Sequence, residues 1–177
     1  MTEHSADDET SAAAPPGLPE GAHFRIADLV LDEKSVVRRS PDVEHERKVA
    51  IFDLLEDNSF DPVGLPSGPY NLILSIEDNR LVFDVRTIAD KKLDSFSLPV
   101  GAFRRIVKDY FMICDSYFEA IKRSTPSQIE AIDMGRRGLH NEGAAILKDR
   151  LADKAGIDET TARRLFTLVC VLHIRGT

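Results

Sequence analysis

The chain has 177 residues, 42% hydrophobic and 30% charged, which is typical of one soluble globular domain. Five of its 30 acidic residues and none of its 23 lysines and arginines lie in residues 1–22, so the net charge of −7 falls to −2 for the rest. A domain so near neutrality is not expected to bind nucleic acid or anionic lipid through its total charge.

Localisation can be predicted from three features of the sequence. The N-terminus lacks the basic and apolar regions of a secretory signal, and no run of about 18 apolar residues could span a membrane. Cys114 and Cys170 lie in apolar segments, where free thiols usually serve as small core residues. We therefore expect a cytoplasmic protein without a disulfide framework or a membrane span.

The first third of the chain predicts a tail, a strand and a helix. Residues 1–22 are rich in Ala, Pro and acidic residues and are predicted to be a disordered acidic tail before a single domain over 23–177. Residues 24–31 favour a strand. Ser40-Pro41-Asp42 is typical of a helix start, and apolar residues at helical spacing continue to about residue 57. Residues 58–69, with three prolines and two glycines, are predicted to be a loop.

The middle of the chain predicts a β-hairpin over residues 70–87. Tyr70, Leu72 and Leu74 alternate with polar residues, and the alternation resumes after Asp78-Asn79. Residues 93–98 favour a further strand. Three helices follow: one over about 103–121, one opened by a capping box at Thr125, and an apolar one after Asp158 that must be buried or lie in an interface. We predict an α+β fold with a small antiparallel sheet packed against four helices.

One face of the third predicted helix carries polar groups. Asp133, Arg136, Arg137, His140 and Asn141 follow one another at i, i+3, i+4, i+7 and i+8. The two arginines could hold a carboxylate or phosphate beside a titratable histidine. The alternative is a solvated face on which Asp133 pairs with the arginines.

Three glycines in the same segment favour the binding interpretation. Gly135, Gly138 and Gly143 each cost a helix about 1 kcal/mol relative to alanine. We therefore expect either a close approach of another backbone or a break in the helix near residues 135–138.

A second polar cluster lies at the start of the first predicted helix. His45 and Glu46, followed by Arg47, resemble the opening of a zinc-protease motif, but Val49 occupies the position of the second histidine. We predict no metal site and no cofactor, and expect His45 to be half-buried. The alternative is an enzyme in which His45 and His140 meet in one concave site.

Residues 151–168 have the pattern of a DNA-binding helix–turn–helix. Gly156 would occupy the turn, and Thr161, Arg163 and Arg164 would lie near the bases. Asp158 and Glu159 would then lie close to the phosphates, which is unfavourable. DNA binding is therefore an alternative that we do not favour.

Four strings of residues together indicate a family. They are PDVEHER at 41–47 with IFDLL at 51–55, RIVKDYF at 105–111, IEAIDMGRRGLHNEG at 129–143 and TARRLFT at 161–167. On these strings the chain resembles the uncharacterised bacterial protein family UPF0262 from about residue 24 to residue 176. The resemblance implies no activity, cofactor or catalytic residue. The tail before Gly21 and the segment 152–156 depart from the family pattern, which weakens the DNA-binding interpretation.

The sequence thus leaves the function unknown and favours a cytoplasmic regulatory or interaction module. Its ligand would be an anionic small molecule or the carboxylates of a protein partner. We expect affinity to fall as the pH rises past the pKa of His140. The candidate ligand-binding residues are Asp133, Arg136, Arg137, His140, Asn141, His45, Glu46 and Arg47.

Overall fold

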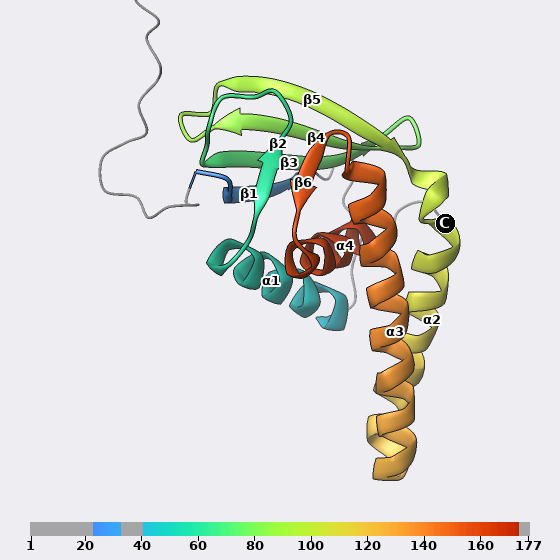
Figure 1. Ribbon diagram of the computed structural model, residues 1–177. Coiled ribbons are helices and arrows are strands. Elements are labelled where there is room, and N and C mark those ends of the chain that lie inside the picture. Colours follow the sequence, from blue (N-terminus) through green and yellow to red (C-terminus); the bar gives the residue numbers. More distant parts are fainter. Residues whose placement is uncertain (1–22, 33–40, 174–177) are drawn as a thin grey trace, which may run out of the picture.

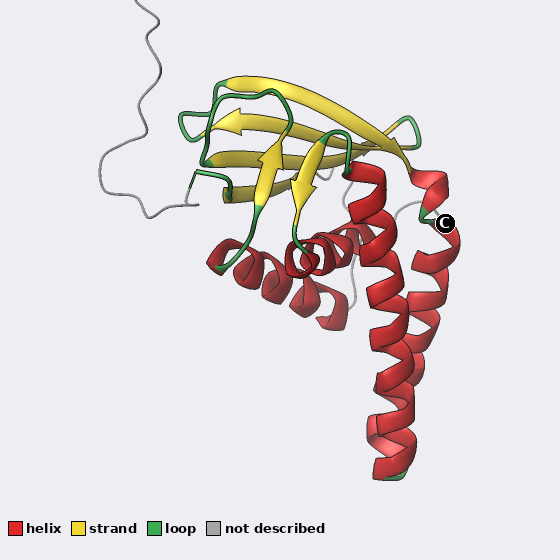
Figure 2. Ribbon diagram, in the orientation of Figure 1, coloured by secondary structure: helices red, strands yellow, loops and turns green. Residues whose placement is uncertain are grey.

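The computed structural model describes residues 23–32 and 41–173 of the chain. These residues form a four-stranded sheet, a two-stranded sheet and four α-helices, which confirms the predicted α+β class (Figure 1). The helices lie on one side of the larger sheet (Figure 2). The predicted tail, residues 1–22, lies outside the described residues.

The larger sheet has the strand order β1 (Ile26–Asp32), β3 (Tyr70–Glu77), β4 (Arg80–Thr87) and β5 (Lys92–Pro99). The hairpin of β3 and β4 confirms the prediction, and its turn residues Asp78 and Asn79 have φ of 50° and 59°, as tight hairpin turns require. One feature corrects the prediction, because β1 pairs with β3 in parallel and the sheet is therefore mixed. Side-chain alternation reports which face of a strand is buried and not the direction of its neighbour.

The helices bury the inner face of this sheet. They are α1 (Pro41–Glu56), α2 (Arg104–Arg123), α3 (Pro126–Leu151) and α4 (Glu159–His173), and a short 3-10 helix over Val100–Ala102 precedes α2. Helices α2 and α3 form an antiparallel hairpin that extends beyond the rest of the molecule (Figure 1). The predicted capping box at Thr125 is present, with both of its hydrogen bonds to Gln128.

Helix α4 is enclosed by its own chain. Its apolar side chains are nearly all inaccessible to solvent, so of the two predicted alternatives, burial and an interface, the structure shows burial. It packs against α1 and α3. The buried residues of α4 are Thr161, Ala162, Leu165, Phe166, Leu168, Val169, Cys170, Val171 and Leu172.

A second, two-stranded sheet connects distant parts of the chain. Strand β2 (Phe60–Pro62), within the predicted loop after α1, pairs antiparallel with β6 (Ala155–Ile157), between α3 and α4. The segment predicted to form the turn of a helix–turn–helix is therefore a strand. Thr161 is fully buried and its hydroxyl accepts a hydrogen bond from the backbone N–H of Ser59. The structure contradicts the helix–turn–helix interpretation.

Helix α3 is continuous through its glycines, so the predicted break is absent. A Cβ at Gly143 would overlap the ring of Phe166 on α4, and a Cβ at Gly135 would lie 2.7 Å from Ile113 on α2. The close approach is thus made by side chains and not by another backbone. Gly138 has no such neighbour within 4 Å, and the structure gives no packing reason for it.

Candidate functional site

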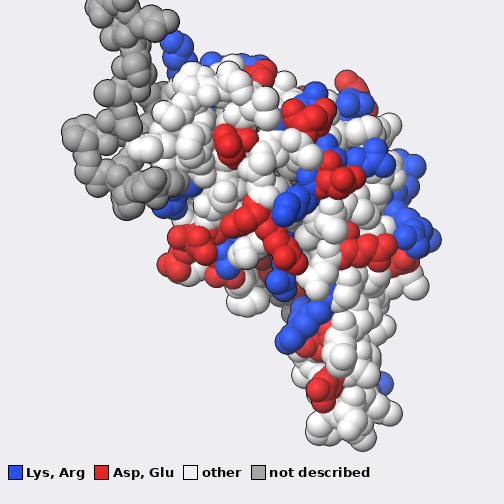
Figure 3. Space-filling model, viewed as in Figure 1, with Lys and Arg blue, Asp and Glu red and all other residues white. Residues whose placement is uncertain are grey.

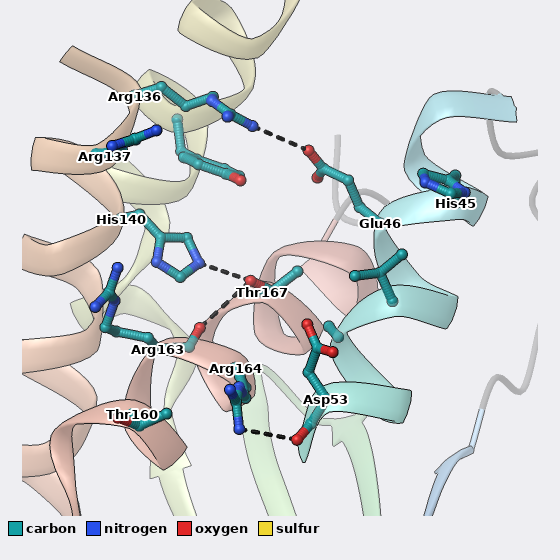
Figure 4. Close-up of a pocket in the computed structure, with 13 residues that line it drawn as sticks. His45, Glu46, Asp53, Arg136, Arg137, His140, Thr160, Arg163, Arg164 and Thr167 are labelled. Carbon is teal, nitrogen blue, oxygen red and sulfur yellow. Dashed lines mark hydrogen bonds and ion pairs between the residues drawn. The ribbon is translucent and has the colours of Figure 1, made fainter. Parts of the chain in front are cut away.

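A pocket of about 440 Å³ opens between α1, α3 and α4 (Figure 4). Each helix presents residues to it at the three- and four-residue spacing of one helix face. Helix α2 adds Tyr110 to the floor. The polar lining from the other three helices is His45, Glu46 and Asp53 on α1, Arg136, Arg137 and His140 on α3, and Thr160, Arg163, Arg164 and Thr167 on α4.

Arg136 makes contacts with residues of α1, α2 and α3 beside the pocket. Its Nη2 lies 2.8 Å from Asp133 Oδ1 and its Nη1 lies 3.8 Å from Glu46 Oε1, so it links α3 to α1. The guanidinium carbon is 4.5 Å from the ring centroid of Tyr117 on α2, a cation–π distance. The hydrogen bond from Arg136 holds the pKa of Asp133 below its usual range. Arg136 therefore has mainly a structural role.

Two other arginines are more accessible. The side chain of Arg137 is 70% exposed and pairs with Asp133, at 2.9 Å between Nη2 and Oδ2. Arg163 is exposed, and within the described ranges its guanidinium forms no hydrogen bond or ion pair. Figure 4 shows this guanidinium beside His140, on the α3 side of the pocket. These two cations are available to a ligand.

His140 is held by packing and by one short hydrogen bond. Its Nε2 lies 2.6 Å from Thr167 Oγ1. The centroid of its ring lies 5.5 Å from that of Tyr110 and 5.4 Å from that of Phe166. Burial, together with the smaller effects of the neighbouring Arg163 and Arg136, lowers its pKa from 6.5 to about 4. His140 is therefore neutral near pH 7. The predicted fall of affinity as the pH rises past the pKa of His140 therefore applies near pH 4 and not near neutral pH, and it stays a prediction.

The α1 side of the pocket carries the carboxylates. Glu46 faces Arg136, whereas the carboxylate of Asp53 points into the pocket (Figure 4). Arg164 donates hydrogen bonds of 2.8 Å to the main-chain oxygens of Asp53 and Asp57. The Asp53 oxygen also accepts a 3.3 Å hydrogen bond from the Asp57 N–H, so Arg164 adds a charged donor at the end of α1 and fixes α4 against α1.

The structure brings together five of the eight predicted site residues. His45, Glu46, Arg136, Arg137 and His140 line the pocket. Three do not line it: Asp133 supports the two arginines, Arg47 pairs with Glu44 at 3.3 Å, and Asn141 is exposed. His45 is itself exposed, which corrects the expectation that it would be half-buried.

Sequence reasoning missed the contribution of α4. Thr160, Arg163, Arg164 and Thr167 have the same i, i+3, i+4, i+7 spacing that singled out α3. That signal is present in the sequence, but the helix–turn–helix alternative accounts for Arg163 and Arg164 without placing them in a pocket with α3. Asp53 and Tyr110 gave no signal of their own, because isolated polar positions on amphipathic helices are common.

Three further observations concern metal ligands, membrane-spanning helices and surface charge. Across the part of the chain that is described, no three His, Cys, Asp or Glu side chains are grouped as a metal ion would require. Over the same ranges, no helix has both the length and the hydropathy needed to cross a bilayer. Figure 3 shows basic and acidic side chains intermixed on the visible face, with no extended patch of one sign.

The fold and the pocket define an α+β protein with an arginine-rich cavity between three helices. A model of the uncharacterised protein family UPF0262 matches residues 23–175, and the chain belongs to this family. A UPF0262 protein of Rhodospirillum rubrum is 64% identical over 151 residues, covering 85% of this chain and 93% of the relative. A UPF0262 protein of Agrobacterium fabrum is 60% identical over 153 residues, covering 86% and 97%. No solved structure matches the chain.

Proposed function

We propose that this chain is a regulatory or interaction module whose pocket binds the anionic group of a small molecule. Four arginines line the pocket against two carboxylates. The observation that carries the proposal is the exposed Arg163, whose guanidinium is left without a protein partner in the described residues. Guanidinium groups bind carboxylates and phosphates through paired hydrogen bonds, and Arg137 offers a second one.

The shape of the site favours a small molecule over the flat surface of a protein partner. A volume of about 440 Å³ lies within the range of small-molecule sites. His140 and Thr167 add neutral groups that can exchange hydrogen bonds with a ligand. Because His140 is neutral near pH 7, we expect anion affinity to depend on the arginines and on ionic strength, and to change little between pH 6 and 8.

The test is a thermal-shift titration with inorganic phosphate and with small carboxylates. A ligand at about ten times its Kd stabilises the folded state by about 1.4 kcal/mol, or about 3–6 °C in a chain of this size. Arg163→Gln should abolish most of this shift. Arg150→Gln, an exposed arginine on α3 outside the pocket, is the matched control and should retain it.

Arg136 is a poor test position, because its removal would break its own ion pairs with Asp133 and Glu46 and would alter stability. The proposal fails if no phosphate or carboxylate raises the melting temperature of the wild type at low salt. It also fails if Arg163→Gln and Arg150→Gln respond alike.

A second candidate is an enzyme, because His45 and His140 line the same pocket and His140 lies 2.6 Å from the Thr167 hydroxyl. In that hypothesis neutral His140 would accept a proton, although a base with a pKa of about 4 is weak near pH 7. Turnover that is lost in His140→Gln, while anion-dependent stabilisation remains, would favour the enzyme.

We also propose that the protein is cytoplasmic. Both cysteines are free and buried, and burial raises the pKa of Cys114 to about 11, so its thiol is poorly reactive. These thiols behave as core residues and need no oxidising compartment. Cell fractionation with a labelled chain tests this proposal.

A further inference from the structure

The two sides of the pocket carry charges of opposite sign. Arg163 comes from α4 and lies on the α3 side, whereas Asp53 projects from α1 on the other side (Figure 4). His140 and Thr167 lie between them and are bonded to each other. The pocket therefore presents the guanidinium of Arg163 on one side, neutral groups in the middle, and the carboxylate of Asp53 beside Arg164 on the other side.

Asp53 differs from the other carboxylate of the lining. Glu46 faces Arg136 at 3.8 Å, but the carboxylate of Asp53 makes no hydrogen bond or ion pair within residues 23–32 and 41–173. Arg164, its neighbour, directs its hydrogen bonds to main-chain oxygens at the end of α1. Asp53 is also partly buried, and a partly buried carboxylate without a partner gains from binding a cation.

These charges discriminate between classes of anionic ligand. A ligand with one anionic group would satisfy Arg163 but leave Asp53 without a partner. A ligand with anionic groups at both ends would place one of them near Asp53, which is repulsive. A ligand with an anionic group at one end and an ammonium group at the other can pair with both Arg163 and Asp53. The pocket volume of about 440 Å³ is large enough for an amino acid or a phosphorylated amine.

We infer that the ligand of this pocket is a small zwitterion, with its carboxylate or phosphate at Arg163 and Arg137 and its ammonium group at Asp53. This inference rests on the proposed anion binding and adds the chemistry of the second end. It identifies Asp53 as the residue that would distinguish amines from other anions.

The experiment compares pairs of compounds that differ only in the ammonium group. The probes are γ-aminobutyrate against butyrate and valerate, and phosphoethanolamine against propyl phosphate, with inorganic phosphate as a common reference. Dissociation constants are measured by NMR chemical-shift titration, which reads the weak binding expected of such small molecules. We expect the amine of each pair to bind the wild type at least about tenfold more tightly, the gain expected from a charged hydrogen bond.

Two matched variants assign this preference to one side chain. Asp53→Asn keeps the main-chain oxygen that binds Arg164 and should bring the ratio within each pair close to one. Asp57→Asn removes a charge one turn further along, outside the pocket, and should keep the wild-type ratio. Arg163→Gln should weaken both members of each pair by a similar factor.

The outcomes separate the two proposals. If phosphate binds but the amines gain nothing over their alkyl partners, or if Asp53→Asn keeps the gain, this inference is overturned while anion binding stands. If neither phosphate nor any probe binds the wild type, anion binding itself is overturned and this inference with it.

Discussion

The depressed pKa of His140 predicts a specific loss of stability in acid. In the unfolded chain the imidazole has a pKa near 6.5, whereas in the folded chain burial lowers it to about 4. Between these values the unfolded state binds more protons than the folded state, so the free energy of unfolding decreases as the pH falls. Above pH 6.5 the contribution is fully present, and below about pH 4 no further loss arises from this group.

The magnitude follows from the difference between the two pKa values. At 1.36 kcal/mol for each pKa unit the upper bound is about 3 kcal/mol, and the partial exposure of the ring reduces it to about 2 kcal/mol. A loss of this size should lower the melting temperature by about 4–8 °C between pH 7 and pH 4. Carboxylates elsewhere also titrate in this range, so the wild type alone cannot isolate the effect.

The assay therefore compares the free energy of unfolding of two proteins. Urea unfolding of the wild type and of His140→Gln is compared near pH 7 and near pH 4, and the stability advantage of the wild type should shrink by about 2 kcal/mol on acidification. His45→Gln, at an exposed histidine, should keep the acid sensitivity of the wild type. If the difference between wild type and His140→Gln is the same at both pH values, His140 is not held neutral by the fold and the reasoning is refuted.

Four further substitutions test the packing of α3 and α4. Gly143→Ala should destabilise the fold by about 1–3 kcal/mol in urea unfolding, because its methyl group would overlap Phe166. Gly138→Ala should instead stabilise the fold by about 0.5–1 kcal/mol. Equal effects of the two substitutions would contradict the packing described for α3. Arg164→Ala should cost about 1.5–3 kcal/mol, since two carbonyls at the end of α1 lose a charged donor. Arg164→Lys should recover only part of this loss, because a lysine cannot reproduce the forked geometry, and full recovery would show that charge alone matters.

The elements that could be predicted from the sequence are those whose residues follow a local periodic pattern. The hairpin of β3 and β4 follows from alternation on either side of Asp78-Asn79, and α3 begins at a capping box that four residues specify. The pairing of β1 with β3 and of β2 with β6 joins segments far apart in the chain. No local pattern encodes such partners, and three-residue strands are too short to show a period.

The candidate site could be predicted only in part, because only part of it follows from a local pattern. The polar face of α3 is a local pattern, and its residues Arg136, Arg137 and His140 do line the pocket. That α4 would supply another wall depends on the packing of two helices that are separated by β6. The pKa of His140 is set by that packing as well, because Phe166 and Arg163 come from α4.

The distribution of the pocket over the chain has a consequence for how the protein is made. Its walls are drawn from residues 45 to 167, and α4 is the last of them to be synthesised. Until α4 leaves the ribosome, the inward faces of α1 and α3 have no helix to cover them. The nascent chain then exposes apolar surface and is open to chaperones, and any ligand recognised by this pocket can stabilise only a chain in which α4 has already been made.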